Sequence, residues 1–425
     1  MKKNRLLQKM NSRRTVLLAA GILVLTQSAA SICQNQAERD GTEDFVRAFT
    51  SVGPGTQSYT EGEPYNEKQW GFLNNGLFRL IDDKGTALLQ NLSGKKGGAS
   101  QGPEREGAGT IYAKPGMDID LMPAREAYAA KSEKNQVVVA VIDTGIQLNH
   151  EDLSGAIWVN EDEIPGDAVD NDKNGFVDDV NGWNFYSGNS HLYTGTEDNH
   201  GTHSAGTIAA EKNGKGITGI CDPAYVKIMP VKVLGTEEGI GTPENVAKAI
   251  RYAEANGASI CNLSFGTVKF NQELYDTMKN SNMLFVVAAG NGDKSGTGMN
   301  IDENPIYPAS FDLDNIISVA SMRLDGNLDP SSNYGEKNVD LAAPGKYILS
   351  TISGNQYAYM SGTSMAAPMV SGTAAMIKSA YPGLETGKIR EIILSSSRKN
   401  SAMEGKVHTG GMLDAGKAME TAAGV

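Results

Sequence analysis

The sequence predicts an α/β protein in which a mainly parallel, twisted sheet lies between two layers of helices. Apolar runs rich in β-branched residues recur at 136–143, 226–234, 258–265, 282–290 and 316–322. Helical patterns separate several of these runs. The runs are apolar at nearly every position, as expected for strands that are buried on both faces. Such strands in alternation with helices form parallel sheets.

The first thirty residues have the features of an export signal. Six Lys or Arg and no acid precede a 12-residue apolar core, and small residues around Ala30 suit a signal peptidase. We expect residues 1–30 to be a signal peptide and the protein to be exported, either secreted or periplasmic. An uncleaved membrane anchor or a lipid on Cys33 is less favoured, because the apolar core is short and Ile32 is bulky for lipoprotein processing.

Residues 31–110 are predicted to be an N-terminal extension of the main domain. The stretch 65–92 resembles a short folded segment in which "DDKG" at 82–85 forms a hairpin turn. The Gly-rich stretch 93–110 is typical of a flexible linker or an exposed loop. The main domain is expected to span 111–425.

Two helical patterns have recognisable ends. The pattern at 242–257 has Thr242 as N-cap, a proline at the first helical position and Gly257 as its stop. The pattern at 364–380 contains Pro368, which is tolerated only near a helix start. This helix should therefore begin close to residue 364.

The composition is that of an acidic globular chain. Its 425 residues are 40% hydrophobic, enough for one large domain or two ordinary ones. The net charge is −12, and without residues 1–30 there remain 32 Lys and Arg against 50 Asp and Glu, a balance of −18. Such a chain should avoid nucleic acid and anionic membranes and could host hard cations such as calcium. Cys33, Cys221 and Cys261 form no disulfide framework, and the last two are expected to be small buried hydrophobes.

Polar residues follow the predicted strands at the sheet edge where ligands of parallel sheets bind. Asp143 lies at the tip of the first strand in "VIDTG", and Asn291 follows "VVAAG" between two glycines. Ser364 begins a helix, where backbone N–H groups and the helix dipole favour negative charge. Each residue alone is a weak indication, since an acid after a strand is often only a cap or turn residue.

Two histidines, His200 and His203, stand one helical turn apart in "DNHGTHSAGTIAA". A metal held by this pair is a minor alternative, because no Glu follows in zincin spacing. Together with Asp143, Asn291 and Ser364, a histidine here meets the requirements of acyl transfer. The histidine takes the serine proton, the aspartate fixes its tautomer, and an amide donor holds the oxyanion.

Four segments resemble the signature blocks of the subtilisin-like serine proteases, the subtilase family. They are "VAVIDTGI", "HGTHSAGT", "AAGN" and "GTSMAAPMVSG", in the order and at the spacing of that family. The resemblance covers about residues 116–424. It implies a three-layer subtilisin-like fold and an exported serine endopeptidase that acts on polypeptides through an acyl-enzyme, as a monomer, with no organic cofactor and no nucleic-acid partner.

The resemblance also implies a role for each site residue. Asp143 is expected as the orienting acid, His200 as the base and Ser364 as the nucleophile. Asn291 is expected to donate to the oxyanion together with the backbone N–H of Ser364.

A peptide substrate is expected to add as a strand between two edges of the protein. By resemblance, one edge contains Ser264, Phe265 and Gly266, and 234–242 forms the opposing edge. A catalytically silent, calcium-stabilised binding protein on the same scaffold is the alternative from another class. It is disfavoured because all four catalytic positions hold suitable residues.

The acidic segment "DAVDNDKNGFVDD" resembles the opening of an EF-hand loop, with oxygen ligands at alternate positions and a glycine at the sharp bend. Asn181 stands where an EF-hand has its last Glu, so a calcium loop is expected but not a full EF-hand. A solvated acidic turn is the alternative. The expected ligands are Asp170, Asp172, Asn174, Phe176, Asp178 and Asp179.

A second calcium site is implied by the family resemblance alone. Asp152 in "HEDL" and Asn213 in "EKNGKGI" match positions that help to bind calcium in many subtilases. Both ions would be structural, because a ligand that binds only the folded state stabilises it.

Only about forty residues separate Ala30 from the "QWGF" segment, fewer than an ordinary folded domain needs. We therefore expect the chain to lack the inhibitory pro-domain of most secreted subtilases. We expect the Gly-rich stretch 93–110 to be open to autoprocessing.

Overall fold

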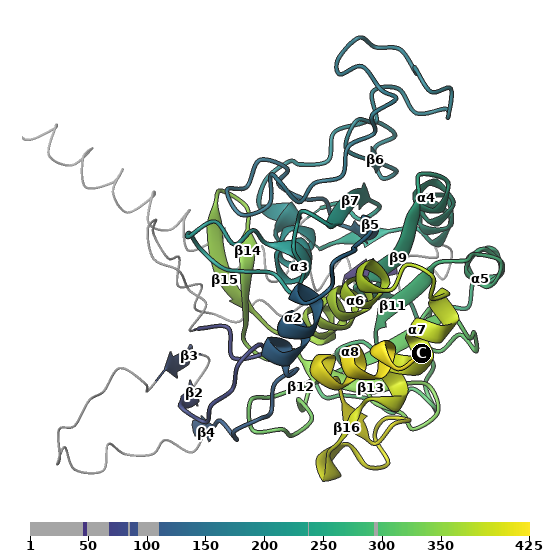
Figure 1. Cartoon of the computed structure of the whole chain (residues 1–425). Helices are drawn as coiled ribbons and strands as arrows, with labels where there is room; N and C mark the ends of the chain where they lie inside the picture. Colours follow the sequence, from purple (N-terminus) through teal and green to yellow (C-terminus); the bar gives the residue numbers. More distant parts are fainter. Residues whose placement is uncertain (1–45, 49–67, 84–85, 92–109, 237, 293–295) are drawn as a thin grey trace, which may run out of the picture. The chain divides into compact units, whose positions relative to one another are not determined.

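In the computed structural model, a sheet lies between two layers of helices (Figure 1). The structure describes residues 46–48, 68–83, 86–91, 110–236, 238–292 and 296–425. These residues all belong to one unit, Val46–Val425. The predicted signal peptide, Cys33 and nearly all of the Gly-rich stretch lie outside the described residues.

The central sheet has nine strands in the order β16-β17-β13-β12-β11-β9-β5-β7-β6. Every neighbouring pair is parallel except β16 with β17. The five predicted runs are confirmed as β5, β7, β9, β11 and β12. The bounds are β5 Val137–Asp143, β6 Trp183–Asn184, β7 Val226–Lys232, β9 Ala258–Leu263, β11 Leu284–Ala288, β12 Ile316–Met322, β13 Leu341–Pro344, β16 Arg398–Lys399 and β17 Gly411–Met412.

One apolar core lies on each face of this sheet, which explains why its strands are apolar at nearly every position. In β5, Val139 and Val141 belong to one core, whereas Ala140 and Ile142 belong to the other. The first core is completed by α2 Leu121–Ala129, α3 Asn199–Ala209, α6 Thr363–Ala380, α7 Thr386–Ser395 and α8 Ala415–Ala423. The second is completed by α4 Pro243–Ala255 and α5 Gln272–Lys279.

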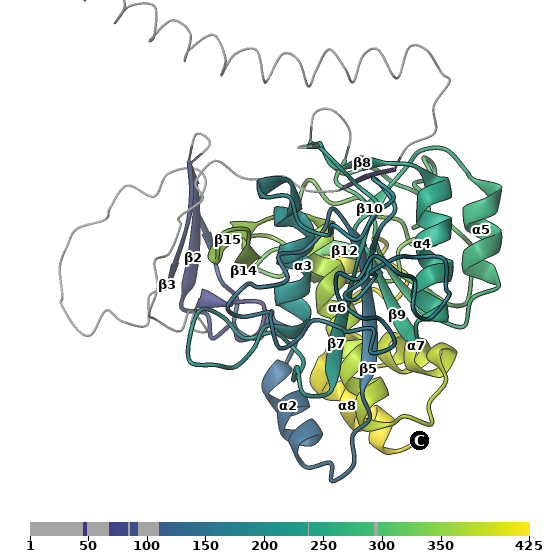
Figure 2. The same cartoon turned by 90° about the horizontal axis from the view of Figure 1, so that it is seen from above.

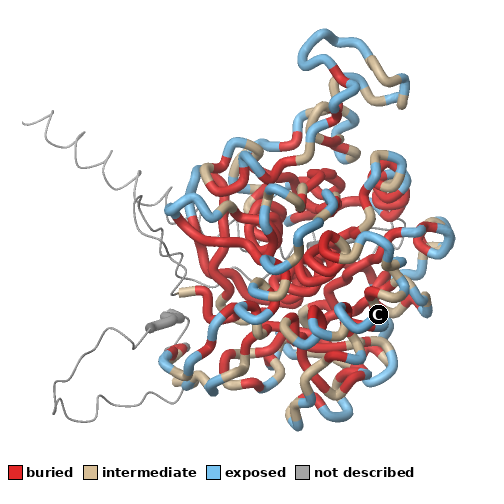
Figure 3. Tube along the Cα trace, viewed as in Figure 1, coloured by how far each residue is buried: buried red, intermediate tan, exposed pale blue. Residues whose placement is uncertain are grey.

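Helix α6 is buried along almost its whole length (Figure 3). It begins at Thr363, one residue before the predicted start, and Pro368 lies in its second turn. Helix α4 has the predicted ends, because the Thr242 side chain accepts a hydrogen bond from the N–H of Asn245 and Pro243 is its first residue. Short 3₁₀ turns span Thr196–Asp198 and Ser401–Met403.

Three small antiparallel sheets surround the central one. They are formed by β14 Ile348–Ile352 with β15 Gln356–Met360, by β2 Phe78–Asp83 with β3 Thr86–Asn91 and β4 Thr110–Tyr112, and by β1 Val46–Ala48 with β8 Ile240–Gly241 and β10 Phe265–Gly266. Asp83 pairs with Thr86, which confirms the predicted hairpin, although residues 84–85 of its turn are outside the described ranges.

Part of the predicted N-terminal extension packs with the main domain. Trp70 and Leu80 are wholly buried and Phe78 is nearly so, all in the first core. The indole N–H of Trp70 donates to the carbonyls of Lys346 and Tyr347, at 3.0 and 2.9 Å. The residues around Trp70 are therefore part of the same core as β5 and α6.

Cys221 and Cys261 are both free and buried, as predicted. Burial raises the pKa of the Cys221 thiol to about 12, so this side chain is an inert hydrophobe at neutral pH. None of the helices in the described ranges is both long and apolar enough to cross a membrane.

Candidate active site

Three of the predicted site residues lie at the carboxyl ends of neighbouring parallel strands. Asp143 ends β5, Ser264 directly follows β9, and Asn291 comes three residues after β11. Because β5, β9 and β11 are adjacent and parallel, these ends meet at one edge of the sheet. The fold thus brings together residues that are up to 148 positions apart in the sequence.

His200 lies in the first turn of α3, with its Nδ1 2.7 Å from Asp143 Oδ1. Asp143 is wholly buried and His200 is 4% exposed. The N–H of Thr144 also donates to Asp143 Oδ1, at 2.6 Å. His200 Nε2 is buried and has no hydrogen-bond partner among the described residues. The carboxylate therefore holds the imidazole with its proton on Nδ1 and leaves Nε2 able to accept one.

Two glycines permit this close approach of α3 to the end of β5. A Cβ atom on Gly201 would overlap the carbonyl oxygen of Gly145 and lie 3.2 Å from the Cβ of Asp143. Gly145 has a φ of +118°, a conformation that favours glycine. A side chain on Gly201 would push His200 away from its carboxylate, and one on Gly145 would overlap the Leu192 carbonyl and the Asp198 carboxylate.

Ser364 is buried in the first turn of α6, where Pro368 leaves one carbonyl without its helical donor. Proline has no N–H, so the Ser364 carbonyl four residues earlier needs another partner. The Ser264 hydroxyl donates to that carbonyl at 3.2 Å, and Ser364 Oγ donates to the Ser264 carbonyl at 2.9 Å. These two reciprocal bonds hold the start of α6 against the end of β9.

Further polar side chains support this contact. Asn262 donates its amide N–H to Ser264 Oγ at 3.0 Å, and Ser371 Oγ donates to Asn262 Oδ1 at 2.8 Å. All of these groups are buried. Buried polar groups that satisfy one another in this way keep the backbone around Ser364 in one conformation.

Asn291 is also tied to the start of α6. Its Oδ1 accepts hydrogen bonds from the backbone N–H and the hydroxyl of Thr363, at 2.9 and 3.1 Å. Thr363 Oγ1 in turn accepts from the N–H of Gly290 at 3.1 Å. The amide oxygen of Asn291 is thus the end that Thr363 holds, and Nδ2 is its donor end.

The second histidine of the pair has a different environment. His203 is fully buried and its Nε2 lies 2.9 Å from the carbonyl oxygen of Ile348. Burial lowers the pKa of His203 to about 3, so it is neutral at physiological pH. Because His200 and His203 bind different partners, their arrangement argues against a metal shared between them.

The two predicted substrate edges lie in one small sheet. Phe265 and Gly266 form β10, and β8 lies within the predicted opposing edge, 234–242. Phe265 is wholly buried in the second core, so it contributes its backbone to the edge. Both strands pair with β1.

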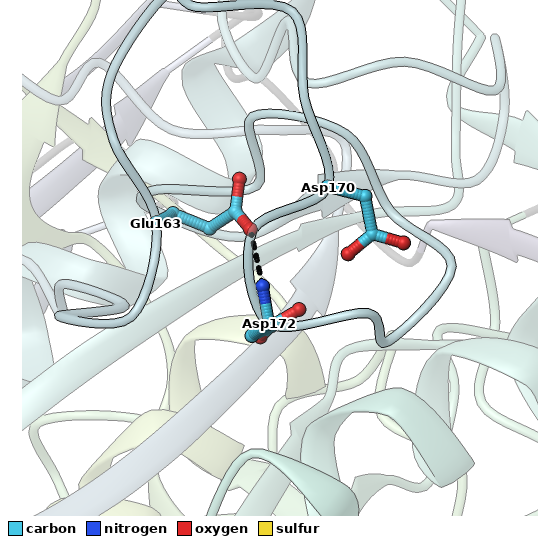
Figure 4. A group of neighbouring side chains, drawn as sticks. All are labelled: Glu163, Asp170 and Asp172. Carbon is cyan, nitrogen blue, oxygen red and sulfur yellow. Dashed lines mark hydrogen bonds between the residues drawn. The ribbon is translucent and has the colours of Figure 1, made fainter.

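The acidic loop before β6 brings together three carboxylates: Glu163, Asp170 and Asp172 (Figure 4). One carboxylate oxygen of each lies within 4.8 Å of the others. Glu163 Oε1 also accepts the backbone N–H of Asp172 at 3.2 Å. The sequence pattern includes Asp170 and Asp172 but misses Glu163, because Glu163 precedes the EF-hand-like segment and only the closure of the loop returns the chain to it.

The other residues predicted in this loop have varied surroundings. Asp178 accepts hydrogen bonds from the backbone N–H groups of Gly166 and Ala168, at 2.7 and 3.1 Å. Asp179 is buried, which raises its pKa, and accepts bonds from two side-chain amides and a tyrosine hydroxyl. Asn174 donates its amide N–H groups to Asp172 and Asp179. The ring of Phe176 packs edge-on against neighbouring aromatic rings.

The two residues of the second predicted calcium site lie together. Asp152 is wholly buried, which raises its pKa. It accepts hydrogen bonds from the Asn213 amide at 3.1 Å and from the N–H of Ile217 at 2.9 Å. The Asp152 carboxylate supplies oxygens of the kind that calcium prefers, and in this structure both of them accept N–H groups.

The carboxyl edge of the parallel sheet thus carries a buried imidazole held by a carboxylate, a serine at a helix start and an asparagine bonded to the residue before that serine. A profile of the subtilase family matches residues 134–412. The chain belongs to the subtilase family, and it is a serine-type endopeptidase.

Individual relatives cover much of the same region. The major intracellular serine protease of Bacillus subtilis is 37% identical over 273 residues, which are 62% of this chain and 77% of that protein. Thermitase of Thermoactinomyces vulgaris is 34% identical over 293 residues, 68% of this chain and 90% of thermitase. Subtilisin-like protease 1 of Plasmodium berghei is 31% identical over 324 residues, which are 72% of this chain and 53% of that protein.

Solved structures show the same fold. A protease from Pseudoalteromonas arctica matches with a TM-score of 0.54 at 30% identity, covering 72% of this chain and 94% of that one. A cold-adapted subtilisin-like serine proteinase matches with a TM-score of 0.53 at 26% identity, covering 67% and 91%. The fold is therefore the predicted three-layer, subtilisin-like α/β fold.

Proposed function

We propose that this chain is an exported endopeptidase that hydrolyses peptide bonds through an acyl-enzyme. Ser364 is the nucleophile, His200 the base and Asp143 the residue that orients the base. The observation that supports this most is the buried pair of His200 and Asp143, with the imidazole Nε2 left to accept a proton. An imidazole held in this way, acting on a serine at the start of a helix, is what a serine protease requires.

The first step requires Ser364 Oγ to leave its present hydrogen-bond partner. Ser364 Oγ donates to the Ser264 carbonyl, and His200 Nε2 has no partner within the described ranges. Rotation of Ser364 about χ1 turns its hydroxyl toward His200. His200 Nε2 then takes the hydroxyl proton as Oγ attacks the substrate carbonyl. Catalytic hydrogen bonds of this kind commonly form only when substrate is bound. Asp143 stabilises the imidazolium, which then protonates the leaving amine.

Asn291 supplies the oxyanion donor in this proposal. Its amide oxygen is held by Thr363, so Nδ2 is set in place before negative charge develops on the substrate. The backbone N–H of Ser364, in the first turn of α6, is the second donor. Donors that are already in place lower the barrier because they need no reorganisation during the reaction.

Export is proposed from the sequence of residues 1–30 alone. We propose that the mature protein is secreted or periplasmic, acts on polypeptides and is a monomer. Separation of culture medium, periplasm and membranes, followed by immunoblotting, tests the location. Recovery of the protein only from the cytoplasm would contradict export.

A fluorophosphonate probe tests the chemistry directly. The wild type should be labelled covalently, and Ser364→Ala should lose the label. Ser379→Ala is the matched control, since Ser379 lies in the same helix but bonds to Tyr128 and Asn135. An unlabelled wild type would instead support the silent binding protein.

We also propose structural calcium ions in the acidic loop and near Asp152. Glu163, Asp170 and Asp172 would hold the first through carboxylate oxygens, and the other predicted loop ligands would complete its shell. The supporting observation is that three like charges meet within 4.8 Å, an arrangement that a hard cation relieves. Asp152 and Asn213 would contribute to the second ion.

Chelation should lower the melting temperature of the Ser364→Ala protein, which cannot digest itself. A ligand at 100 times its Kd stabilises the folded state by about 2.7 kcal/mol. The double variant Glu163→Gln with Asp172→Asn should show a smaller fall in melting temperature on chelation. Asp152→Asn should also reduce this fall, through the second ion. Exposed Glu336 provides the control, Glu336→Gln. A melting temperature that changes neither with the chelator nor with added calcium would contradict the proposal.

A further inference from the structure

Asn333 is a buried asparagine beside the loop that carries the proposed oxyanion donor, Asn291. It lies in the segment between β12 and β13, and β12 packs against α6 (Figure 2). Asn333 is only 1% exposed. Because β12 is the parallel neighbour of β11, the segment after β12 lies next to the loop after β11.

Asn333 binds both peptide groups that flank Asn291. Its backbone N–H donates to the carbonyl of Gly290 at 2.9 Å, and this carbonyl belongs to the peptide group before Asn291. Its Oδ1 accepts the N–H of Gly292 at 2.9 Å, and this N–H belongs to the peptide group after Asn291. Since each peptide group is planar, holding both of them sets φ and ψ of Asn291 and therefore the direction of its side chain.

The Asn333 side chain makes two more bonds to the same region. Its Nδ2 donates to the carbonyl of Ala289 at 2.9 Å, and its Oδ1 also accepts the N–H of Met299 at 2.9 Å. An amide suits this position because it carries an acceptor and a donor in one group. Buried polar groups that are satisfied in this way keep the surrounding backbone in one arrangement.

Asn291 is thus held from two sides. Thr363 binds the amide oxygen of its side chain, whereas Asn333 binds the backbone on both sides of it. The neighbouring Gly290 and Gly292 have φ values of +98° and +72°. Glycine has the greatest backbone freedom of any residue. A donor between two glycines therefore depends on bonds from outside its own loop to stay in place.

We propose that Asn333 is a positioning residue, which keeps Asn291 Nδ2 where negative charge develops on the substrate. This inference rests on the proposed function, because Asn291 acts there as the oxyanion donor. Asn333 acts only through Asn291 and does not itself contact the substrate. Its loss should weaken binding of the transition state and leave binding of the substrate nearly unchanged.

The first test is Asn333→Ala, which removes all of the side-chain bonds. We expect kcat on a peptide substrate to fall about tenfold with little change in KM, because a misplaced donor keeps part of its effect. A peptide aldehyde gives a second readout, since its adduct with Ser364 presents an oxygen to the same donors. Its Ki should rise by about the factor by which kcat falls.

Combination with Asn291→Leu separates positioning from a general structural role. In that background the donor is absent, so Asn333→Ala should lower kcat no further, although the melting temperature of the Ser364→Ala protein should still fall. Asn315→Ala is the matched control, because the Asn315 amide donates to two backbone carbonyls that precede β11. This control should lower the melting temperature and keep the wild-type kcat.

Two results would overturn this inference and leave the proposed function standing. One is a folded Asn333→Ala protein with wild-type kcat, and the other is an equal loss of kcat with and without Asn291→Leu. If Asn333→Ala does not fold, the same criteria apply to Asn333→Asp, which keeps the size and the acceptor oxygen but lacks the donor to Ala289. A wild type that neither reacts with a fluorophosphonate nor hydrolyses peptides overturns the proposed function itself.

Discussion

At the scale of single residues, Asn291 shows how one side chain is used at both ends. Its oxygen is held by Thr363, and its nitrogen is proposed to meet the oxyanion. Asn291→Leu should lower kcat about 10²–10³-fold, the range found in subtilisin for loss of such a donor, with little change in KM. The donor acts mainly in the transition state, so substrate binding should be nearly unaffected.

Thermal melting is the control for this variant, because leucine also removes the bonds to Thr363. A folded Asn291→Leu protein with wild-type kcat would show that Asn291 is not an oxyanion donor. A large rise in KM at constant kcat would place Asn291 in substrate binding instead.

His203 makes stability depend on pH. Its pKa is about 3 in the folded protein because of burial, against an ordinary value of 6.5. Between these values the unfolded chain binds a proton at His203 that the folded chain does not, so stability is lost as pH falls through this window. The contribution is at most about 1.4 kcal/mol per pH unit. Urea unfolding of the Ser364→Ala protein at several pH values measures it.

The variant for this test is His203→Gln, which keeps a donor for the Ile348 carbonyl. Its stability should fall less steeply below pH 6.5 than that of the parent. Exposed His191 supplies the control, His191→Gln, which should leave the slope as it is. Equal slopes for His203→Gln and the parent would mean that His203 takes up its proton at the same pH in the folded and unfolded states.

At the scale of elements, the site depends on how α3 approaches β5. Gly201→Ala should push α3 away from the Gly145 carbonyl and misplace His200 relative to Asp143. We expect kcat/KM to fall about tenfold to a hundredfold, since displacement of a catalytic group by about 1 Å has effects of this size. Steady-state kinetics on a peptide substrate measure the change.

Gly387→Ala is the matched control, because Gly387 lies in α7 with nothing within 4 Å of a Cβ built there. This variant should keep full activity and gain about 0.5–1 kcal/mol of stability, since alanine is the better helix former. Full activity of Gly201→Ala would show that α3 tolerates the displacement.

At the scale of the whole molecule, the segment before the Gly-rich stretch helps to form the core. Trp70 is wholly buried and bonds to two carbonyls beside β14. Trp70→Ala should lower the free energy of unfolding by about 3–5 kcal/mol, through the lost burial and the cavity left behind. Chemical unfolding of the Ser364→Ala protein measures this.

Leu73, three residues later, is 57% exposed and gives the comparison. Leu73→Ala should change stability by no more than about 0.5 kcal/mol. If Trp70→Ala were equally mild, the segment around Trp70 would be a dispensable attachment to the domain.

The central strands and the residues at their ends could be predicted from the sequence, because both depend on residue types that are close together in the chain. The strands β5, β7, β9, β11 and β12 were predictable because burial on both faces favours a nearly continuous apolar run. Asp143, Asn291 and Ser264 were brought to one sheet edge because parallel strands all end there. Glu163 could not be predicted from its pattern, since a loop closure decides which carboxylates meet.

The sequence by itself determined the parallel sheet, the helix starts and the family of the site, because each depends on residue types within a few positions of one another. Only the tertiary structure decided the rest. The hydroxyl of Ser264 compensates for the N–H that Pro368 lacks, and β1 pairs with both β8 and β10. Both are contacts between distant segments in which at least one partner is a backbone group, which every residue carries, so no pattern in the sequence marks them.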